Sequence, residues 1–478
     1  TNLTRFAPLI TPIMHKASVY CHYFFVPNRI LWSNWEDFIS GGEDGLSSPT
    51  FPTLSTIGGN LQPSSLGDYL GLPTGTTNLG TSYTNTPISA MPFAAYNKIY
   101  NDYYRDENLI TTKRVEVLVD GNNPLIGISD PLAKRAWQHD YYTSALPWTQ
   151  RGPEATIPLG GTAPISYQND PGNATYIRDN ATGNIVPNAT FDGVAALETT
   201  GSGATRAFLP SGTFLDFDNA SSLQANLSSA TASSINDLRR AFRLQEWLER
   251  NARGGARYIE IIMAHFGVRS SDSRLQRPEF LGGSSTPITI SEVLQTSDNS
   301  GGVDSGPQGN MAGHGVSVGS SDYISYKCEE HGYIMGIMSV MPMTAYQQGI
   351  PKHWAKFDKF DYFWPSFANI GEQPIYQQEL YHTNVLVDDE AIFGYTPRYA
   401  EYKYVPSTVH GTFRTSLNFW HMGRIFATPP ALNQDFIECD YDEVQRVFAA
   451  PLEEHLYVYL HNEVKATRLM PYFGTPTL

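Results

Sequence analysis

The sequence predicts a mainly β protein with long loop insertions and a few short helices. Three observations lead to this fold class. Runs of β-branched and aromatic residues recur along the 478 residues, as in strands. The 40 Gly and 32 Pro supply turns between such runs. The 28 Tyr, 24 Phe and 8 Trp, with only 17% charged residues, provide area for a core or for contacts and exclude a disordered chain.

Four runs are typical of strands. The first covers residues 19–27, where an apolar and aromatic stretch ends at Pro27 and Asn28. The others cover residues 323–328, 333–340 and 456–460. Because these runs are far apart in the chain, we expect their pairing to be long-range.

Loops and two helices are expected between the strands. Residues 41–90 and 282–322 are rich in Gly, Ser, Thr, Asn and Pro, which predicts long loops. Ser234 is a candidate N-cap of a helix that ends near Gly254 and Gly255. A shorter helix is expected over residues 94–104. The first helix carries one apolar-biased face, formed by Ile235, Leu238, Phe242, Gln245 and Leu248.

Residues 169–234 differ from the rest of the chain because small and polar residues dominate them. We expect an ordered insertion anchored by scattered rings, with residues 1–168 and 235–478 forming the core and its surface loops. Five of six N-x-S/T patterns fall in this segment, and its composition produces them by chance. The anchoring rings include Tyr176, Phe191, Phe208 and Phe214.

Charge and motifs exclude several functions. The net charge of −15 is unlike that of a basic nucleic-acid-binding domain. Cys21, Cys328 and Cys439 form no paired motif, and we interpret them as reduced and buried. No apolar run reaches the roughly 20 residues of a membrane helix, and no signal peptide opens the sequence.

Two local patterns suggest chemistry only weakly. Residues 315–319 match G-x-S-x-G around Ser317, but this motif needs a strand before the serine and a helix after it. We therefore interpret them as a flexible turn. Residues 328–331, Cys-Glu-Glu-His, hold potential metal ligands with no second pair nearby, so a rim loop with solvated carboxylates is favoured.

Two segments combine cations with apolar area. Residues 351–364 carry Lys352, Trp354, Lys356 and Lys359 among many rings, so they are candidates for contact with single-stranded DNA. The helix after Ser234 carries Arg239 and Arg243. Rings and long basic side chains are also typical of subunit interfaces, and we favour that interpretation for both segments.

Several motifs, in order along the chain, resemble those of one family. They are residues 15–29 (HKASVYCHYFFVPNR) followed by Trp32 and Trp35, residues 96–104 (YNKIYNDYY), residues 145–147 (ALP), Arg277-Pro278, residues 330–332 (EHG) and residues 395–403 (YTPRYAEYK). Together they resemble the major capsid proteins of microviruses, the small phages with circular single-stranded DNA. The subgroup most similar is the gokushoviruses, because a long segment lies before the helix at Ser234.

The resemblance implies a viral-type jelly roll of eight antiparallel strands without enzymatic activity. Sixty copies would form a T=1 icosahedral virion around single-stranded DNA, assembled in the cytoplasm of a host bacterium. Residues 169–234 would form protrusions at the threefold axes, which we expect to bind a host receptor. A further N-terminal stretch is usual in the family and is expected here. The subunit contacts are expected to include Trp32, Trp35, Arg239, Arg243, Tyr395 and Tyr399.

The resemblance also implies partners. They are an internal scaffolding protein, a small basic packaging protein and a DNA pilot protein. No cofactor is expected, and a structural divalent cation at an interface is left open. The alternatives are a secreted carbohydrate-binding jelly roll, consistent with the rings and N-x-S/T patterns, and a hydrolase built on Ser317.

Overall fold

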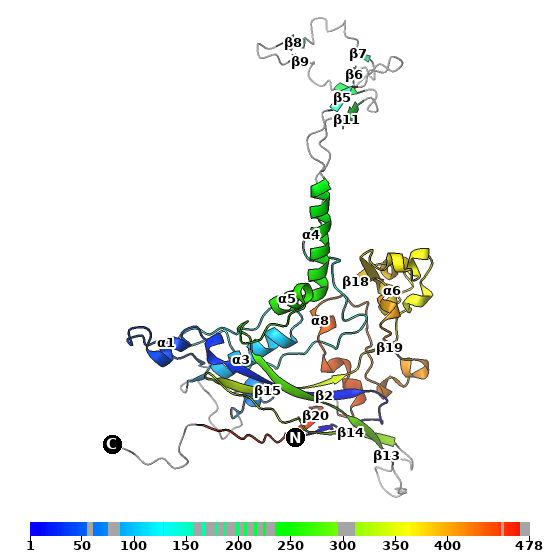
Figure 1. Ribbon diagram of the computed structural model, residues 1–478. Helices are drawn as coiled ribbons and strands as arrows, with labels where there is room; N and C mark the ends of the chain where they lie inside the picture. The colour runs from blue at the N-terminus through cyan, green and yellow to red at the C-terminus, as the bar shows by residue number, and fades with distance from the viewer. Residues whose placement is uncertain are drawn as a thin grey trace, which may run out of the picture. The chain divides into compact units, whose positions relative to one another are not determined.

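The computed structural model describes most of residues 1–478 (Figure 1). By contact density the chain divides into two units, Thr1–Arg151 with Glu249–Leu478, and Gly152–Leu248. None of the described helices is long and apolar enough to cross a membrane. The description leaves out residues 55–60, 75–86, 128, 154, 156–164, 168–176, 180–184, 187–196, 200–204, 208–214, 218–222, 226–234, 295–310, 451–453 and 469–478.

A three-stranded antiparallel sheet has the order β12-β2-β15 and lies in the first unit. Its strands are β2 (Ala17–Pro27), β12 (Glu279–Pro287) and β15 (Gly332–Pro342). The central strand β2 pairs with β15 along its whole length, from Ala17 opposite Pro342 to Pro27 opposite Gly332. The strands predicted over residues 19–27 and 333–340 are confirmed.

A four-stranded antiparallel sheet has the order β13-β14-β1-β20. Its strands are β1 (Asn2–Phe6), β13 (Thr289–Leu294), β14 (Met311–Gly319) and β20 (Leu456–Leu460). In β1, Leu3 lies opposite Val318 on one side and Tyr459 on the other. The strand predicted over residues 456–460 is confirmed.

The chain passes from one sheet to the other between β12 and β13. Ile288, the residue between them, is buried and donates its backbone N–H to the carbonyl of Ala17. An apolar core joins Val19 and Cys21 of β2 to Phe6 of β1. The opposite face of β2, with Phe24 and Val26, packs in a second core. Strand β2 is therefore buried on both faces, which explains its nearly continuous apolar sequence.

Helix α3 (Met91–Ile99) contributes to the second core and continues into a π-helical turn at Tyr100–Tyr104. The ring centroids of Phe24 and Tyr103 lie 4.8 Å apart, and His22 Nδ1 lies 2.7 Å from the Tyr104 hydroxyl oxygen. The helix predicted over residues 94–104 is confirmed, and it begins a few residues earlier than expected.

A third core contains Tyr141, Tyr346, Ile375 and Phe393. It includes parts of a two-stranded sheet of β17 (Glu372–Tyr376) and β18 (Ile392–Pro397). The remaining short elements of this unit are α1 (Trp35–Ser40), β3 (Thr53–Leu54), α2 (Leu66–Tyr69), β4 (Ile88–Ser89), α5 (Tyr258–Phe266), β16 (Ala345–Tyr346), α6 (Gln377–Leu380), α7 (Leu386–Asp389), β19 (Ser407–Thr408) and α8 (Gln434–Ile437).

The loop predicted over residues 282–322 is wrong, because most of its described part forms β12, β13 and β14. Its glycines allow close approach of backbones rather than turns. A Cβ at Gly283 would lie 2.6 Å from the Cys21 carbonyl oxygen, and one at Gly313 would clash with the Thr11 carbonyl. Residues 41–90 do contain short elements, but their described part is largely irregular.

The strand predicted over residues 323–328 is also wrong, because these residues form no regular element. Cys328 is exposed and Cys439 is partly buried, so only Cys21 fits the expectation of a buried thiol. Ser317 lies inside β14 opposite Thr4 and is buried, so the flexible-turn interpretation is wrong. Its strand position does not form the strand-to-helix turn of a nucleophile elbow.

The second unit contains short strands and most of α4 (Ile235–Gly254). Its strand pairs are antiparallel: Ile165–Tyr167 (β5) with Leu223–Ala225 (β11), Ile177–Asp179 (β6) with both Ile185–Val186 (β7) and Leu215–Phe217 (β10), and Leu197–Thr199 (β8) with Thr205–Ala207 (β9). The long helix is confirmed. The expected anchors Tyr176, Phe191, Phe208 and Phe214 lie outside the described residues.

Candidate subunit-contact surfaces

The aromatic segment, residues 354–364, presents an unusual amount of apolar area to solvent. It is formed by short 3-10 turns at Lys352–Trp354 and Lys359–Asp361. Asp361 Oδ2 accepts the backbone N–H groups of Phe357 and Asp358, so the backbone is satisfied locally while the rings point outward. Phe357 is 90% exposed. The exposed large rings are Trp354, Phe357, Phe360, Tyr362, Phe363 and Trp364.

Six exposed rings in one short segment are uncommon on a protein that works as a free monomer. Aromatic residues are also enriched at the centres of protein interfaces. The aromatic segment is therefore a candidate contact surface.

The two lysines before Phe357 are not free to bind a partner. Lys352 Nζ lies 2.9 Å from Glu379 Oε1, and the two side chains are 10% and 0% exposed. Lys356 Nζ lies 2.9 Å from Glu401 Oε1 and 3.9 Å from the centre of the Tyr402 ring. Each positive charge is compensated inside the subunit, which corrects the expectation that both lysines meet phosphates.

Burial and hydrogen bonding act in opposite directions on these carboxyls. Burial raises the pKa of Glu379, although Lys352, the Tyr376 N–H and the Tyr141 hydroxyl favour the ionised form. For Glu401 burial also acts to raise the pKa, but the hydrogen bonds from Gln373 and Lys356 outweigh it and the pKa is lowered. The ionised form of Glu379 therefore depends strongly on the charge of Lys352.

The other two candidates in this region remain accessible. Trp354 is largely exposed, and Lys359 is exposed with its Nζ 5.3 Å from the centre of the Phe360 ring. Glu379 and Glu401, the partners of the paired lysines, were not predicted from the sequence. They lie 27 and 45 positions from their lysines, and no local pattern connects them.

Two rings predicted at subunit contacts lie in the interior of the subunit. Trp32 is fully buried, and its Nε1 donates a hydrogen bond of 2.8 Å to Asp120 Oδ1. Tyr399 is buried and donates its hydroxyl to the Tyr362 carbonyl at 3.0 Å. Both rings stabilise the fold, which corrects their assignment to contacts. Trp35 and Tyr395 are partly buried.

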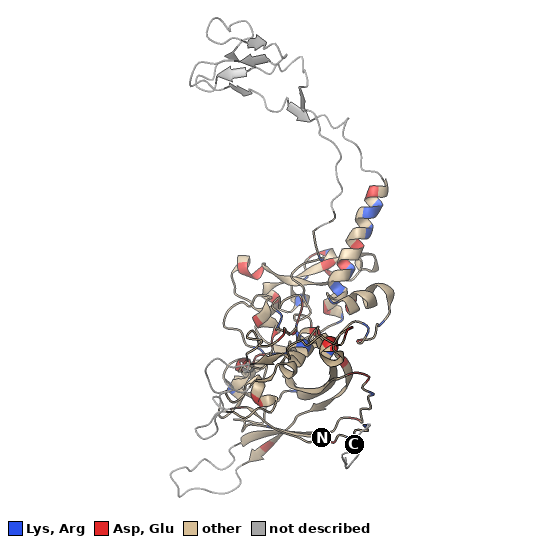
Figure 2. Ribbon diagram, turned by 90° about the vertical axis from the view of Figure 1, so that its left-hand side faces the viewer, with Lys and Arg blue, Asp and Glu red and all other residues tan. Residues whose placement is uncertain are grey.

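Helix α4 carries exposed apolar residues at spacings of three and four. Ile235 and Phe242 are 69% and 67% exposed, and Leu238 lies between them on the same face. Arg239 and Arg243 are exposed too, and Arg243 Nη1 lies 2.6 Å from Glu246 Oε2. Acidic and basic residues both occur along the helix (Figure 2). This mixture is typical of a helix that packs against other helices.

Strand β20 is the third exposed apolar element. Its outer edge pairs with no strand among the described residues, and all five side chains are exposed. Residues 461–468 continue without regular structure and are exposed as well. An uncovered apolar edge strand is a template for pairing with another chain.

In the run at residues 328–331, Glu329 is exposed as expected, but Glu330 is not simply solvated. Glu330 forms a bidentate ion pair with Arg29, with Nε to Oε2 at 3.1 Å and Nη2 to Oε1 at 3.0 Å. Among the residues that the structure describes, no group of three or more His, Cys, Asp or Glu side chains is placed to hold a metal ion.

The exposed apolar elements suit contacts between chains, as in a structural protein. Comparisons with known proteins identify the family. Residues 1–478 match the family model described as capsid protein (F protein). The chain belongs to this family of phage capsid proteins. It is a structural component of a phage virion that assembles as multiple copies, and it is not an enzyme.

Three relatives carry the name capsid protein VP1. The relative from Bdellovibrio phage phiMH2K is 40% identical over 451 residues, which cover 91% of this chain and 80% of the relative. The relatives from Chlamydia phage 1 and Spiroplasma virus 4 are 33% and 32% identical to this chain. The matched residues cover 89% and 88% of the lengths of these two relatives. The resemblance found in the sequence motifs is confirmed, and the hydrolase and carbohydrate-binding alternatives are superseded.

Proposed function

We propose that sixty copies of this chain close into a T=1 icosahedral shell around a circular single-stranded DNA genome, in the cytoplasm of a bacterium. The observation that carries this proposal is the aromatic segment, because its rings need a partner surface that a single subunit does not provide. Closed symmetry lets identical subunits cover such patches mutually.

The proposed subunit fold is an eight-stranded jelly roll. Two antiparallel sheets, β13-β14-β1-β20 and β12-β2-β15, share an apolar core, and the chain crosses between them at Ile288. Sheets that face each other across a core in this way are the basis of jelly rolls in viral shells. These seven strands support the proposal, which requires one more strand.

At the threefold axes we propose that three copies of α4 pack together through Ile235, Leu238 and Phe242, with Arg239 and Arg243 beside the contact. The spacing of the three apolar residues fits the seam of a helical bundle. Residues 169–234 would then form a protrusion that binds a receptor on the bacterial host, since surface insertions carry recognition in many proteins.

Genome packing requires positive charge from other molecules. The chain carries −15 charges, and two of its candidate lysines are compensated by Glu379 and Glu401. A small basic packaging protein would supply the neutralisation, while Trp354 and Lys359 contribute contacts with bases and phosphates from inside the shell. An internal scaffolding protein and a DNA pilot protein complete the proposed set of partners.

Assembly is tested by two substitutions at one ring. Phe357→Ser removes an exposed ring that makes no contribution to the described cores, so we expect a folded subunit with few or no particles in negative-stain microscopy. Phe357→Leu keeps apolar area and serves as the control. Normal particle yield from Phe357→Ser, with circular dichroism equal to that of the parent chain, would refute the role of this segment.

Host recognition is tested by replacing residues 169–234 with a short Gly/Ser linker. We expect intact particles that no longer adsorb to cells, so that their packaged genome copies remain in the supernatant after incubation with cells. Normal adsorption by the shortened particles would exclude the insertion as the receptor-binding element.

A further inference from the structure

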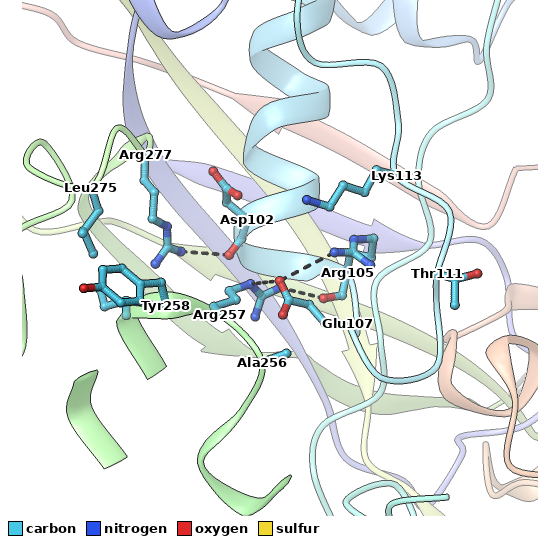
Figure 3. A pocket seen from close by; sticks show the side chains of 11 residues that line it. Asp102, Arg105, Glu107, Thr111, Lys113, Ala256, Arg257, Tyr258, Leu275 and Arg277 are labelled. Atoms are coloured by element: carbon cyan, nitrogen blue, oxygen red, sulfur yellow. Dashed lines mark hydrogen bonds and ion pairs between the residues drawn. The ribbon is translucent and has the colours of Figure 1, made fainter. Parts of the chain in front are cut away.

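A cavity of about 570 Å³ in the first unit is lined by an excess of cations. We call it the basic pocket, and define it by Arg105, Lys113, Arg257 and Arg277 together with the carboxylates Asp102 and Glu107. One wall comes from the end of the π-helical turn and the segment after it, and the other from the start of α5 and the segment before β12 (Figure 3). Four cations and two carboxylates line the cavity; of these cations, Arg257 also pairs with Glu260, and Arg277 lies 4.0 Å from Asp272.

Arg257 forms the frame of the pocket. Its Nε lies 3.1 Å from Glu107 Oε1, and its Nη1 lies 3.1 Å from Glu260 Oε1. Its Nη2 donates to the Arg105 carbonyl at 2.7 Å. Both Nη atoms donate hydrogen bonds, whereas Nε is buried without one despite its ion pair with Glu107, so Arg257 mainly positions the walls of the pocket.

In Arg105 and Arg277, as in Arg257, part of the donor capacity is unused. Arg105 is 5% exposed, and its Nε has no hydrogen-bond partner among the described residues. Its Nη2 lies 3.6 Å from Glu107, too far for a hydrogen bond. Arg277 donates from Nη2 to the Asp102 carbonyl at 2.9 Å, while its Nε is buried without a hydrogen-bond partner in the same part of the structure.

Unused buried donors are costly, because burial removes water without replacing its hydrogen bonds. Lys113 adds an exposed ammonium for which the described residues provide no partner. The donors approach the cavity from different directions, with Lys113 and Arg105 on one side and Arg277 on the other (Figure 3). A planar carboxylate satisfies one such direction, whereas the tetrahedral oxygens of a phosphate satisfy several.

We propose that the basic pocket binds a phosphate group, held by Arg105, Lys113 and Arg277. Free phosphate and a phosphodiester share this chemistry. A phosphate carries between one and two negative charges near neutral pH, and Lys113, the lining cation without an ion-pair partner among the described residues, would offset part of that charge. The cavity is larger than a phosphate, so Tyr258 and Leu275 on its lining can contact a group attached to it. The proposal does not depend on the proposed shell, since all its residues belong to one subunit.

Calorimetric titration of the full chain with inorganic phosphate, at constant ionic strength, tests the proposal. Lys113→Met should weaken binding roughly threefold to tenfold, because one charge-assisted contact is lost. Glu107→Gln should strengthen binding by a similar factor, because the competing carboxylate is removed. Lys16→Met, an exposed lysine outside the pocket, is the matched control and should bind as the parent chain does.

A short single-stranded oligonucleotide without terminal phosphate distinguishes the two sources. Competition with inorganic phosphate that is weakened by Lys113→Met supports a phosphodiester ligand, and phosphate binding without competition supports free phosphate. Absence of phosphate binding overturns the proposal. So do equal effects of Lys113→Met and Lys16→Met, or a Glu107→Gln variant that binds no more tightly than the parent chain.

Discussion

Two regions of the first unit bury basic side chains, and they do so in opposite ways. Beside the aromatic segment, Lys352 and Lys356 each face one carboxylate at 2.9 Å, so every charge has a partner. In the basic pocket the arginines pair with Glu107, Glu260 and Asp272, but their three Nε donors have no hydrogen-bond partner and Lys113 has no ion-pair partner among the described residues. Fully satisfied pairs serve the fold, whereas the unpaired Lys113 and the unused guanidinium donors are the groups that the proposed ligand would engage. Local sequence shows the cations of both regions equally well but does not distinguish these roles.

The largest expected effect comes from breaking the more buried pair. Glu379→Gln should lower the free energy of unfolding by about 3 kcal/mol, because it leaves the Lys352 ammonium buried without its counter-charge. Urea denaturation of the isolated subunit measures the change. The double variant Glu379→Gln with Lys352→Met should recover part of the loss. A loss of less than about 0.5 kcal/mol for the single variant would show that the pair is not essential to the fold.

A smaller effect is expected from acid acting on the second pair. The pKa of Glu401 is lowered in the folded state from its usual 4.5. Its contribution to stability is therefore present above pH 4.5 and is lost as the pH falls through the folded pKa. Thermal unfolding followed from about pH 6 to pH 3 should show a shallower acid loss for Glu401→Gln than for the parent chain. Parallel curves would mean that Glu401 does not titrate differently on folding.

The smallest effect is expected in the basic pocket. Lys113→Met should change the free energy of unfolding by no more than about 0.5 kcal/mol, because the lysine is exposed and has no ion-pair partner within the described structure. Urea denaturation without phosphate is the measurement. Destabilisation as large as that of Glu379→Gln would remove the contrast between the two regions.

The sequence predicted the strands and helices whose own residues determine them. Strand β2 is continuous in its apolar pattern because both faces are buried, and α4 carries its own apolar spacing. Strands β12 to β14 were missed because Gly283 and Gly313 mark close backbone approaches, which resemble turn glycines in the sequence. Tyr323–Cys328 has the composition of a strand but no neighbour to pair with among the described residues.

The candidate site was predicted only in part, for a related reason. The exposed rings of the aromatic segment follow from composition, since no helical or strand period directs them inward. Glu379, Glu401 and the walls of the basic pocket depend on residues brought together by tertiary folding. Trp32 was assigned to an interface because Trp is common there, but its indole N–H finds Asp120 inside the subunit, which allows burial.

The position of β1 has a consequence for the timing of folding. This strand, near the start of the sequence, lies between β14 and β20, and Leu3 is paired with both Val318 and Tyr459. Such distant pairing slows folding, because a long loop must close before its contacts are gained. On the ribosome, β1 lacks one neighbour until residues 456–460 have emerged. We therefore expect each subunit to complete this sheet only after residues 456–460 have been synthesised, so that a shorter nascent chain cannot present a mature surface to others.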